Sequence, residues 1–114
     1  MRAYSKVYIS DDVASVFGPG VLKLLRGIQN TGSVKEAANN MKMSYSKALK
    51  ILKKAEKYLG FEVVEKYRGG DSGGESIVTK EGKRLIESYD RLCSEVDRAL
   101  ESGFKEHFSW MEEI

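Results

Sequence analysis

The fold of this 114-residue chain is decided by the stretch Thr31-Gly-Ser-Val-Lys-Glu-Ala-Ala-Asn-Asn-Met-Lys-Met-Ser-Tyr-Ser-Lys-Ala-Leu-Lys-Ile-Leu-Lys-Lys-Ala-Glu-Lys-Tyr-Leu-Gly60. Ser33 stands at an N-cap position, and Glu36, three residues later, can reach back to the cap amide, which completes a capping box. After a break at Lys42-Met43, Ser44 offers a second cap for a helix that ends before the closing glycine. Two helices joined by such a short turn are typical of a helix-turn-helix, which indicates DNA binding.

The second of these helices has two chemically different faces. Its apolar face consists of Ala48, Ile51, Leu52, Ala55 and Leu59, and its other face carries Lys47, Lys50, Lys54 and Lys57 at steps of three or four residues. A lysine stripe alone is more often a solvated helix face than a nucleic-acid footprint. Its place in a helix-turn-helix favours contact with DNA.

Composition places the chain among cytoplasmic single-domain proteins. With 41% hydrophobic and 32% charged residues, it has no apolar run long enough to cross a bilayer. Met1 to Val7 lacks the apolar core of a signal peptide, and the single Cys93 cannot form an internal disulfide. We therefore expect a cytoplasmic protein with no membrane partner.

Charge is distributed unevenly, although the net charge is only +2. From Lys35 to Arg68 there are nine Lys or Arg against four Glu, whereas from Glu81 to Ile114 there are five basic residues against nine acidic ones. A basic middle followed by an acidic tail concentrates the attraction for phosphate on one part of the surface.

The flanking segments complete a winged helix. Ser5–Ile9 and Val13–Phe17 predict a hairpin around Asp11-Asp12, and Val21 to Ile28 predicts a helix after the break at Gly18-Pro19-Gly20. Phe61–Tyr67 and Ser76–Thr79 alternate as strands on either side of the glycine-rich tip Arg68–Gly74, which predicts a wing. The expected fold is mainly α with a small β component: a winged helix-turn-helix over residues 1–78, with an N-terminal β-hairpin, and a long C-terminal dimerisation helix and tail over 79–114.

The long helix is predicted to begin at Thr79, an N-cap followed by Glu81 in the first turn. Its apolar stripe consists of Leu85, Tyr89, Leu92, Val96, Leu100 and Phe104. Because this stripe outruns the small body that could cover it, we expect it to pair with a second copy of the chain. The alternative is that the stripe folds back on its own domain.

The chain resembles the N-terminal DNA-binding domain of the molybdate-responsive ModE regulators, a branch of the LysR-like winged helices. The resemblance spans about Ser5 to Leu92 and rests on Thr31-Gly-Ser33 with Ala37-Ala38, Ser44-Tyr45 with Lys47-Ala48, Gly69-Gly70 and Gly73-Gly74, and Thr79-x-x-Gly82 leading into Leu85, Ile86 and Tyr89. It implies a homodimer with the helix over residues 44–59 in the major groove and the wing over 61–78 on the backbone or minor groove.

The chain departs from this family pattern in three places. Leu49 stands where many relatives carry Trp, and Asp71-Ser72 replaces a more basic or glycine-rich wing tip. The chain also ends at Ile114 after its long helix, whereas the family continues into a molybdate-binding domain. We therefore expect no molybdate site in this chain.

The predicted DNA contacts come from the helix-turn-helix and the wing. They are Ser33, Lys35, Ser44, Tyr45, Ser46, Lys47, Lys50, Lys54, Lys66, Tyr67 and Arg68. Residues at the amino end of the helix are expected to meet base edges, and the lysines further along and the wing to meet phosphates. Tyr45 has the alternative of being a core aromatic residue.

No catalytic, metal or cofactor site is predicted. Cys93 and His107 lie fourteen residues apart without partners at ligand spacing, and the glycine tip lacks the Gly-Lys-Ser/Thr of a phosphate-binding loop. The sequence predicts a sequence-specific, dimeric transcriptional regulator that binds double-stranded DNA. The alternative is a winged-helix module that binds protein, with the lysines serving only solubility.

Overall fold

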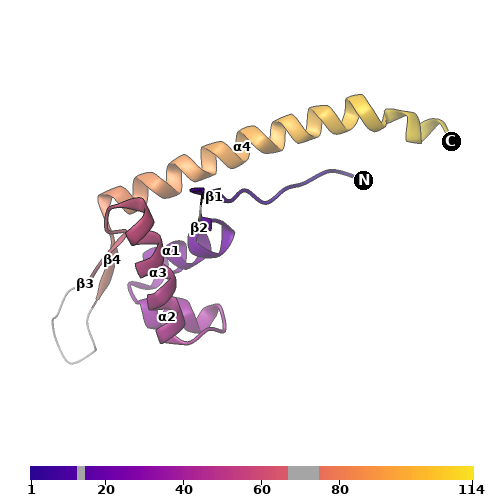
Figure 1. Ribbon diagram of the computed structural model, residues 1–114. Helices are drawn as coiled ribbons and strands as arrows, with labels where there is room; N and C mark the ends of the chain where they lie inside the picture. The colour runs from indigo at the N-terminus through magenta and orange to yellow at the C-terminus, as the bar shows by residue number, and fades with distance from the viewer. Residues whose placement is uncertain (13–14, 67–74) are drawn as a thin grey trace.

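The computed structural model describes residues 1–12, 15–66 and 75–114. Within these ranges, four α-helices and four short strands follow one another (Figure 1). They are β1 (Ile9–Ser10), β2 (Ser15–Phe17), α1 (Pro19–Thr31), α2 (Val34–Asn40), α3 (Tyr45–Leu59), β3 (Val64–Lys66), β4 (Ser76–Val78) and α4 (Lys80–Phe108), with a final 3₁₀ turn over Ser109–Glu113. The prediction of a mainly helical fold with a small β component is confirmed.

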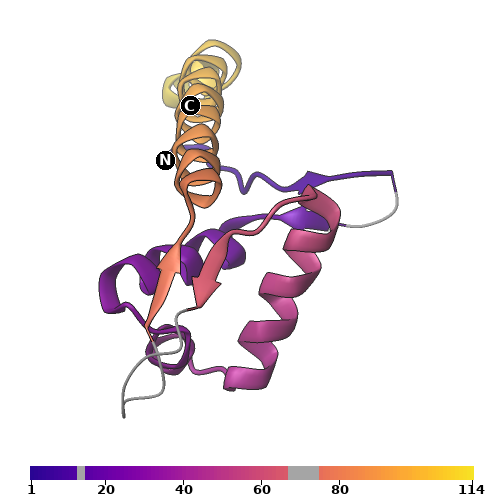
Figure 2. The same ribbon diagram turned by 90° about the vertical axis from the view of Figure 1, so that its left-hand side faces the viewer.

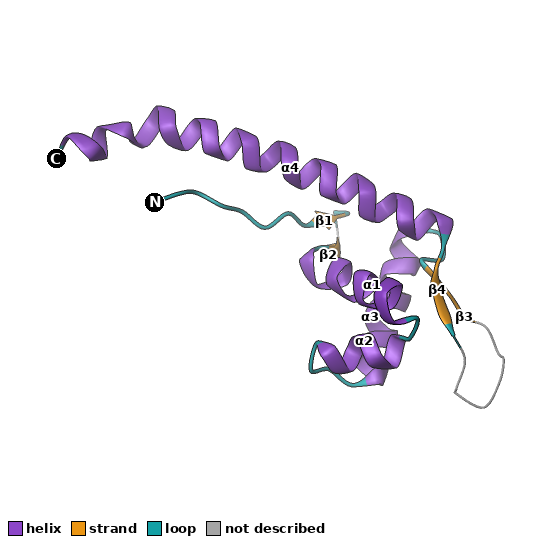
Figure 3. Ribbon diagram, turned by 180° about the vertical axis from the view of Figure 1, so that it is seen from behind, coloured by secondary structure: helices purple, strands orange, loops and turns teal. Residues whose placement is uncertain are grey.

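The first strand of each hairpin begins later in the structure than the sequence suggests. β1 pairs antiparallel with β2, but Ser5 to Tyr8 run extended without strand pairing beside α4 (Figure 3). β3 pairs antiparallel with β4 and begins only at Val64, three residues after the predicted start at Phe61. The predicted strand start over residues 13–14, the predicted wing tip over residues 68–74 and the strand end at Tyr67 lie outside the described residues.

The core lies where α1, α2 and α3 cross. Leu24, Leu25 and Ile28 of α1 are buried, together with the small residues of α2 and α3 that face them. Gly27 marks the closest approach, because a Cβ there would lie 3.0 Å from the Cβ of Ala37. Small residues at this crossing allow the backbones of α1 and α2 to approach closely.

Helix ends follow the sequence signals with two corrections. α1 begins at Pro19, inside the predicted break, because proline is well tolerated in the first helical turn. The Ser33 hydroxyl accepts from the Glu36 amide at 3.1 Å, as predicted, but the Ser33 amide donates to Thr31 Oγ1 at 3.2 Å. The acceptor of the Ser33 amide is therefore the Thr31 hydroxyl and not the Glu36 carboxylate that the capping box predicted.

The first part of α4 packs on the body. Tyr89 is only 4% exposed; its ring meets Phe17 edge-on, with the centroids 5.0 Å apart, and its hydroxyl donates to the Val7 carbonyl at 2.6 Å. Burial, reinforced by a hydrogen bond with Cys93, raises the pKa of Tyr89 to about 12, so the hydroxyl keeps its proton near neutral pH. This position contradicts the assignment of Tyr89 to the dimer interface.

The outer part of α4 runs past the body, and the N-terminal segment lies beside it (Figure 1). The molecule is 65 Å long in consequence, and α4 alone accounts for about 43 Å of helix. None of the helices in the described ranges, including the 29-residue α4, is both long enough and apolar enough to cross a membrane.

Candidate nucleic-acid interface

The turn between α2 and α3 is fixed by backbone hydrogen bonds. The Lys42 amide donates to the Asn39 carbonyl and the Met43 amide to the Ala38 carbonyl, each at 3.0 Å. The Ser44 hydroxyl then accepts from the Lys47 amide at 3.1 Å and caps α3. These contacts hold the amino end of α3 at the lower edge of the body, with α3 along one side (Figure 2).

The amino end of α3 presents the predicted base-reading residues to solvent. Tyr45 is 45% exposed, so it is not a core residue and the alternative assignment is wrong. Ser44, Ser46 and Lys47 are also exposed, although the Ser44 hydroxyl already accepts the cap hydrogen bond. An exposed aromatic ring beside two hydroxyls and an ammonium is suited to contacts with base edges and phosphates.

The rest of α3 separates into two faces as predicted. Ala48, Leu52 and Ala55 are buried, whereas Lys47, Lys50, Lys54 and Lys57 are all exposed. Lys35 on α2 is exposed as well, and the half-buried Ser33 is the cap of α2. One side of the helix-turn-helix is therefore lined with positive charge.

Of the three DNA contacts predicted in the wing, one lies within the described residues. Lys66 lies at the end of β3, at the base of the tip. The predicted phosphate contacts Tyr67 and Arg68 lie outside the described residues. Their role stays a prediction.

One functional residue was missed by the sequence analysis. The carboxylate of Glu56, on α3, accepts from the Val63 amide at 2.8 Å and from the Val64 amide at 3.5 Å. It therefore ties α3 to the start of the wing. The sequence signal was a single glutamate among the lysines of the helix, one turn before the glycine that ends it.

A second junction joins the wing to α4 and to the rest of the body. The Thr79 hydroxyl donates to the Glu62 carbonyl at 2.7 Å and accepts from the Gly82 amide at 2.9 Å. The Thr79 amide donates to the Val63 carbonyl at 3.0 Å, and the Ser76 amide donates to the Gly32 carbonyl at 2.9 Å. Through these bonds, α3, the wing and α4 have a fixed mutual orientation.

Replacing Glu56 by Ala is expected to lower the free energy of unfolding by about 1–3 kcal/mol, because the amide of the fully buried Val63 loses its acceptor. Glu56→Gln keeps an acceptor oxygen and is expected to recover most of this loss. Urea unfolding followed by circular dichroism measures both. Glu62→Ala, which removes an exposed carboxylate nearby, is the control. Equal stability of Glu56→Ala and this control would contradict the role of Glu56.

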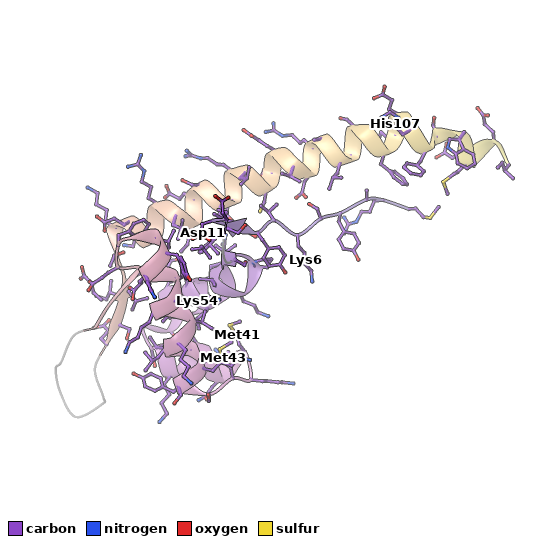
Figure 4. The ribbon with its side chains drawn as sticks, in the orientation of Figure 1. Lys6, Asp11, Met41, Met43, Lys54 and His107 are labelled. Atoms are coloured by element: carbon purple, nitrogen blue, oxygen red, sulfur yellow. The ribbon has the colours of Figure 1, made fainter. Side chains whose placement is uncertain are left out.

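Within the described residues, no group of three or more His, Cys, Asp or Glu could hold a metal ion. His107 lies on the outer part of α4, far from Lys54 on α3 (Figure 4), and Cys93 is half-buried on the inner part of the same helix.

Comparison with known proteins agrees with this geometry. No family model matches the chain. The structure of the BenM DNA-binding domain in complex with benA site 1 DNA is similar, with a TM-score of 0.53 and 18% identity over 78% of this chain and 94% of that one. The fold is that of a winged-helix DNA-binding domain.

The sequence relatives of the chain are transcriptional regulators. The chain is 36% identical over 86 residues to the transcriptional regulator ModE of Haemophilus influenzae, covering 75% of this chain and 32% of that protein. It is 30% identical over 83 residues to the DNA-binding transcriptional dual regulator ModE of Escherichia coli K12, covering 73% and 32%. The chain is thus a relative of the ModE transcriptional regulators, and it spans about a third of the length of the curated relatives that it matches.

Proposed function

We propose that the chain is a sequence-specific DNA-binding transcriptional regulator that acts as a homodimer. The observation that carries the proposal is the exposed, lysine-lined face of α3. The amino end of this helix is exposed as well, and the opposite face of the helix is buried in the core. The ModE names of its relatives support a regulatory role, and they favour binding over catalysis.

The fit to DNA follows from the shape and charge of the helix-turn-helix. The major groove is about 12 Å wide and admits an α-helix, with the residues at the amino end nearest the base edges. Tyr45, Ser46 and Lys47 would lie at this end, and Lys50 and Lys54 would follow along the helix towards phosphates. The wing would contact the backbone or the minor groove beside it.

The outer part of α4 is the proposed dimer contact. Leu92 is 41% exposed, and Val96, Leu100 and Phe104 are half-buried. An open hollow of about 750 Å³ lies between the outer part of α4 and the N-terminal segment over residues 1–4. Phe104 and Phe108 line part of this hollow, and their ring centroids are 5.2 Å apart in a stacked arrangement. A second copy would cover this apolar strip, because a two-fold axis presents the same strip twice.

Two α3 helices related by a two-fold axis would meet two half-sites about one helical turn, roughly 34–36 Å, or a multiple of it, apart. Selecting fragments from random or genomic DNA with the full chain tests the proposed function. We expect enrichment of one motif with two-fold symmetry. Selection without any enriched motif, combined with binding of a protein ligand, would favour the protein-binding module instead.

Substitutions within α3 are expected to divide into two kinds. Tyr45→Ala, Ser46→Ala or Lys47→Ala should change which sequence is preferred, by about 1–3 kcal/mol per lost base contact. Lys54→Ala should weaken binding to every sequence by a similar factor, because phosphates carry no sequence information. Affinities for the selected site and for single-base variants of it distinguish the two. A uniform loss for all four variants would contradict base reading by the amino end of α3.

A further inference from the structure

Lys42 has a backbone conformation that its residue type does not favour. Its φ is 57°, and it is the one non-glycine residue with positive φ among the residues that the structure describes. The other positive φ values belong to Gly32 and Gly60, the residues that end α1 and α3. A side chain is strained in this left-handed region, where glycine or asparagine is the usual choice.

The turn around Lys42 is held in place from both sides. The Met41 amide donates to the Ala38 carbonyl at 3.0 Å, and the Met43 amide donates to the same carbonyl at 3.0 Å. Both methionine side chains are half-buried against the core (Figure 4). The Lys42 side chain itself is exposed, and no hydrogen bond or ion pair engages its ammonium within the described ranges. No contact of the ammonium within the described ranges therefore explains a lysine at this position.

Lys42 lies close to the amino end of α3. It lies two residues before Ser44, the cap of α3, so its Cα is within about 7 Å of the amino end of the helix. With that end in a major groove about 12 Å wide, the phosphates that border the groove come within reach of a lysine side chain. From this we propose that Lys42 is a DNA phosphate contact and that its strained conformation is tolerated for that contact. The inference rests on the proposed function of α3.

The test compares variants of the full chain on the selected DNA fragment over a range of salt concentrations. Lys42→Gly relieves the backbone and removes the charge, and Lys42→Asn removes the charge with a residue that tolerates the same conformation. We expect both variants to bind the fragment about 5- to 10-fold more weakly than the wild type near 0.1 M salt. The slope of the logarithm of the binding constant against the logarithm of the salt concentration should be shallower than that of the wild type by about 0.9 for each chain that binds. Their melting temperatures should equal or exceed that of the wild type.

Lys23→Asn is the matched control, because it removes the same charge at a different place. Lys23 lies on the side of α1 that faces Tyr89 and Cys93 of α4, and not at the amino end of α3. It should leave affinity and slope unchanged. Unchanged affinity and slope for the two Lys42 variants, with the wild type binding DNA as expected, would overturn this inference alone. A wild type without salt-dependent DNA binding would instead refute the proposed function, and the inference with it.

Discussion

Replacing Leu92 and Val96 together by Asp is expected to convert a dimer into a monomer. These residues lie on the strip of α4 that the body leaves open, and a second copy would bury them. Two carboxylates in an apolar contact cost about 4 kcal/mol or more, which is about a thousandfold in the dimer dissociation constant. Light scattering or sedimentation measures the change in mass. DNA affinity should fall with it, because each monomer reaches only one half-site.

The control for this experiment adds carboxylates to the opposite face of the same helix. Ser94 and Arg98 share an exposed surface with Asp90, Arg91 and Glu95, so Ser94→Asp with Arg98→Asp should leave the mass unchanged. A monomeric wild type, or a Leu92 and Val96 double variant that remains dimeric, would remove α4 from the dimer interface.

Gly82→Ala is expected to give a large loss of stability. A Cβ at this position would lie 2.6 Å from the Val63 carbonyl oxygen and 2.8 Å from Cγ1 of Val78. The first turn of α4 would have to move away, which weakens the bond that the Thr79 hydroxyl accepts from the Gly82 amide and the bond that it donates to the Glu62 carbonyl. We expect a loss of about 3 kcal/mol, or about 10 °C in melting temperature.

Gly103→Ala is the matched control in the same helix, because nothing lies within 4 Å of a Cβ there. It should be neutral or stabilising by about 0.5–1 kcal/mol, since alanine favours the helix over glycine. Equal stability of Gly82→Ala and Gly103→Ala in thermal unfolding would contradict the close contact between α4 and the wing.

Features that depend on neighbours in sequence could be predicted. The caps at Ser33, Ser44 and Thr79 each use an amide three residues later, and all three form as expected. The two faces of α3 were equally predictable, because helical periodicity alone assigns them. The order of helices, hairpins and wing followed from these local signals.

Features that depend on distant contacts could not be predicted in the same way. Tyr89 fits the apolar stripe of α4, but its hydroxyl bonds to Val7, 82 residues earlier, so only the folded chain shows that it is buried. The bond from Glu56 to the wing depends on how the chain turns after α3, so the single glutamate on a lysine-rich helix does not by itself indicate its partner. Which part of α4 the body covers is likewise set by packing.

The salt dependence of binding to the selected DNA fragment, compared with a shuffled fragment of equal length, tests the central claim that α3 reads DNA. We expect two chains on the selected fragment, about a thousandfold preference over the shuffled one, and a log–log slope of about −5 or steeper. Equal affinity for the two fragments, or binding insensitive to salt, would contradict the claim.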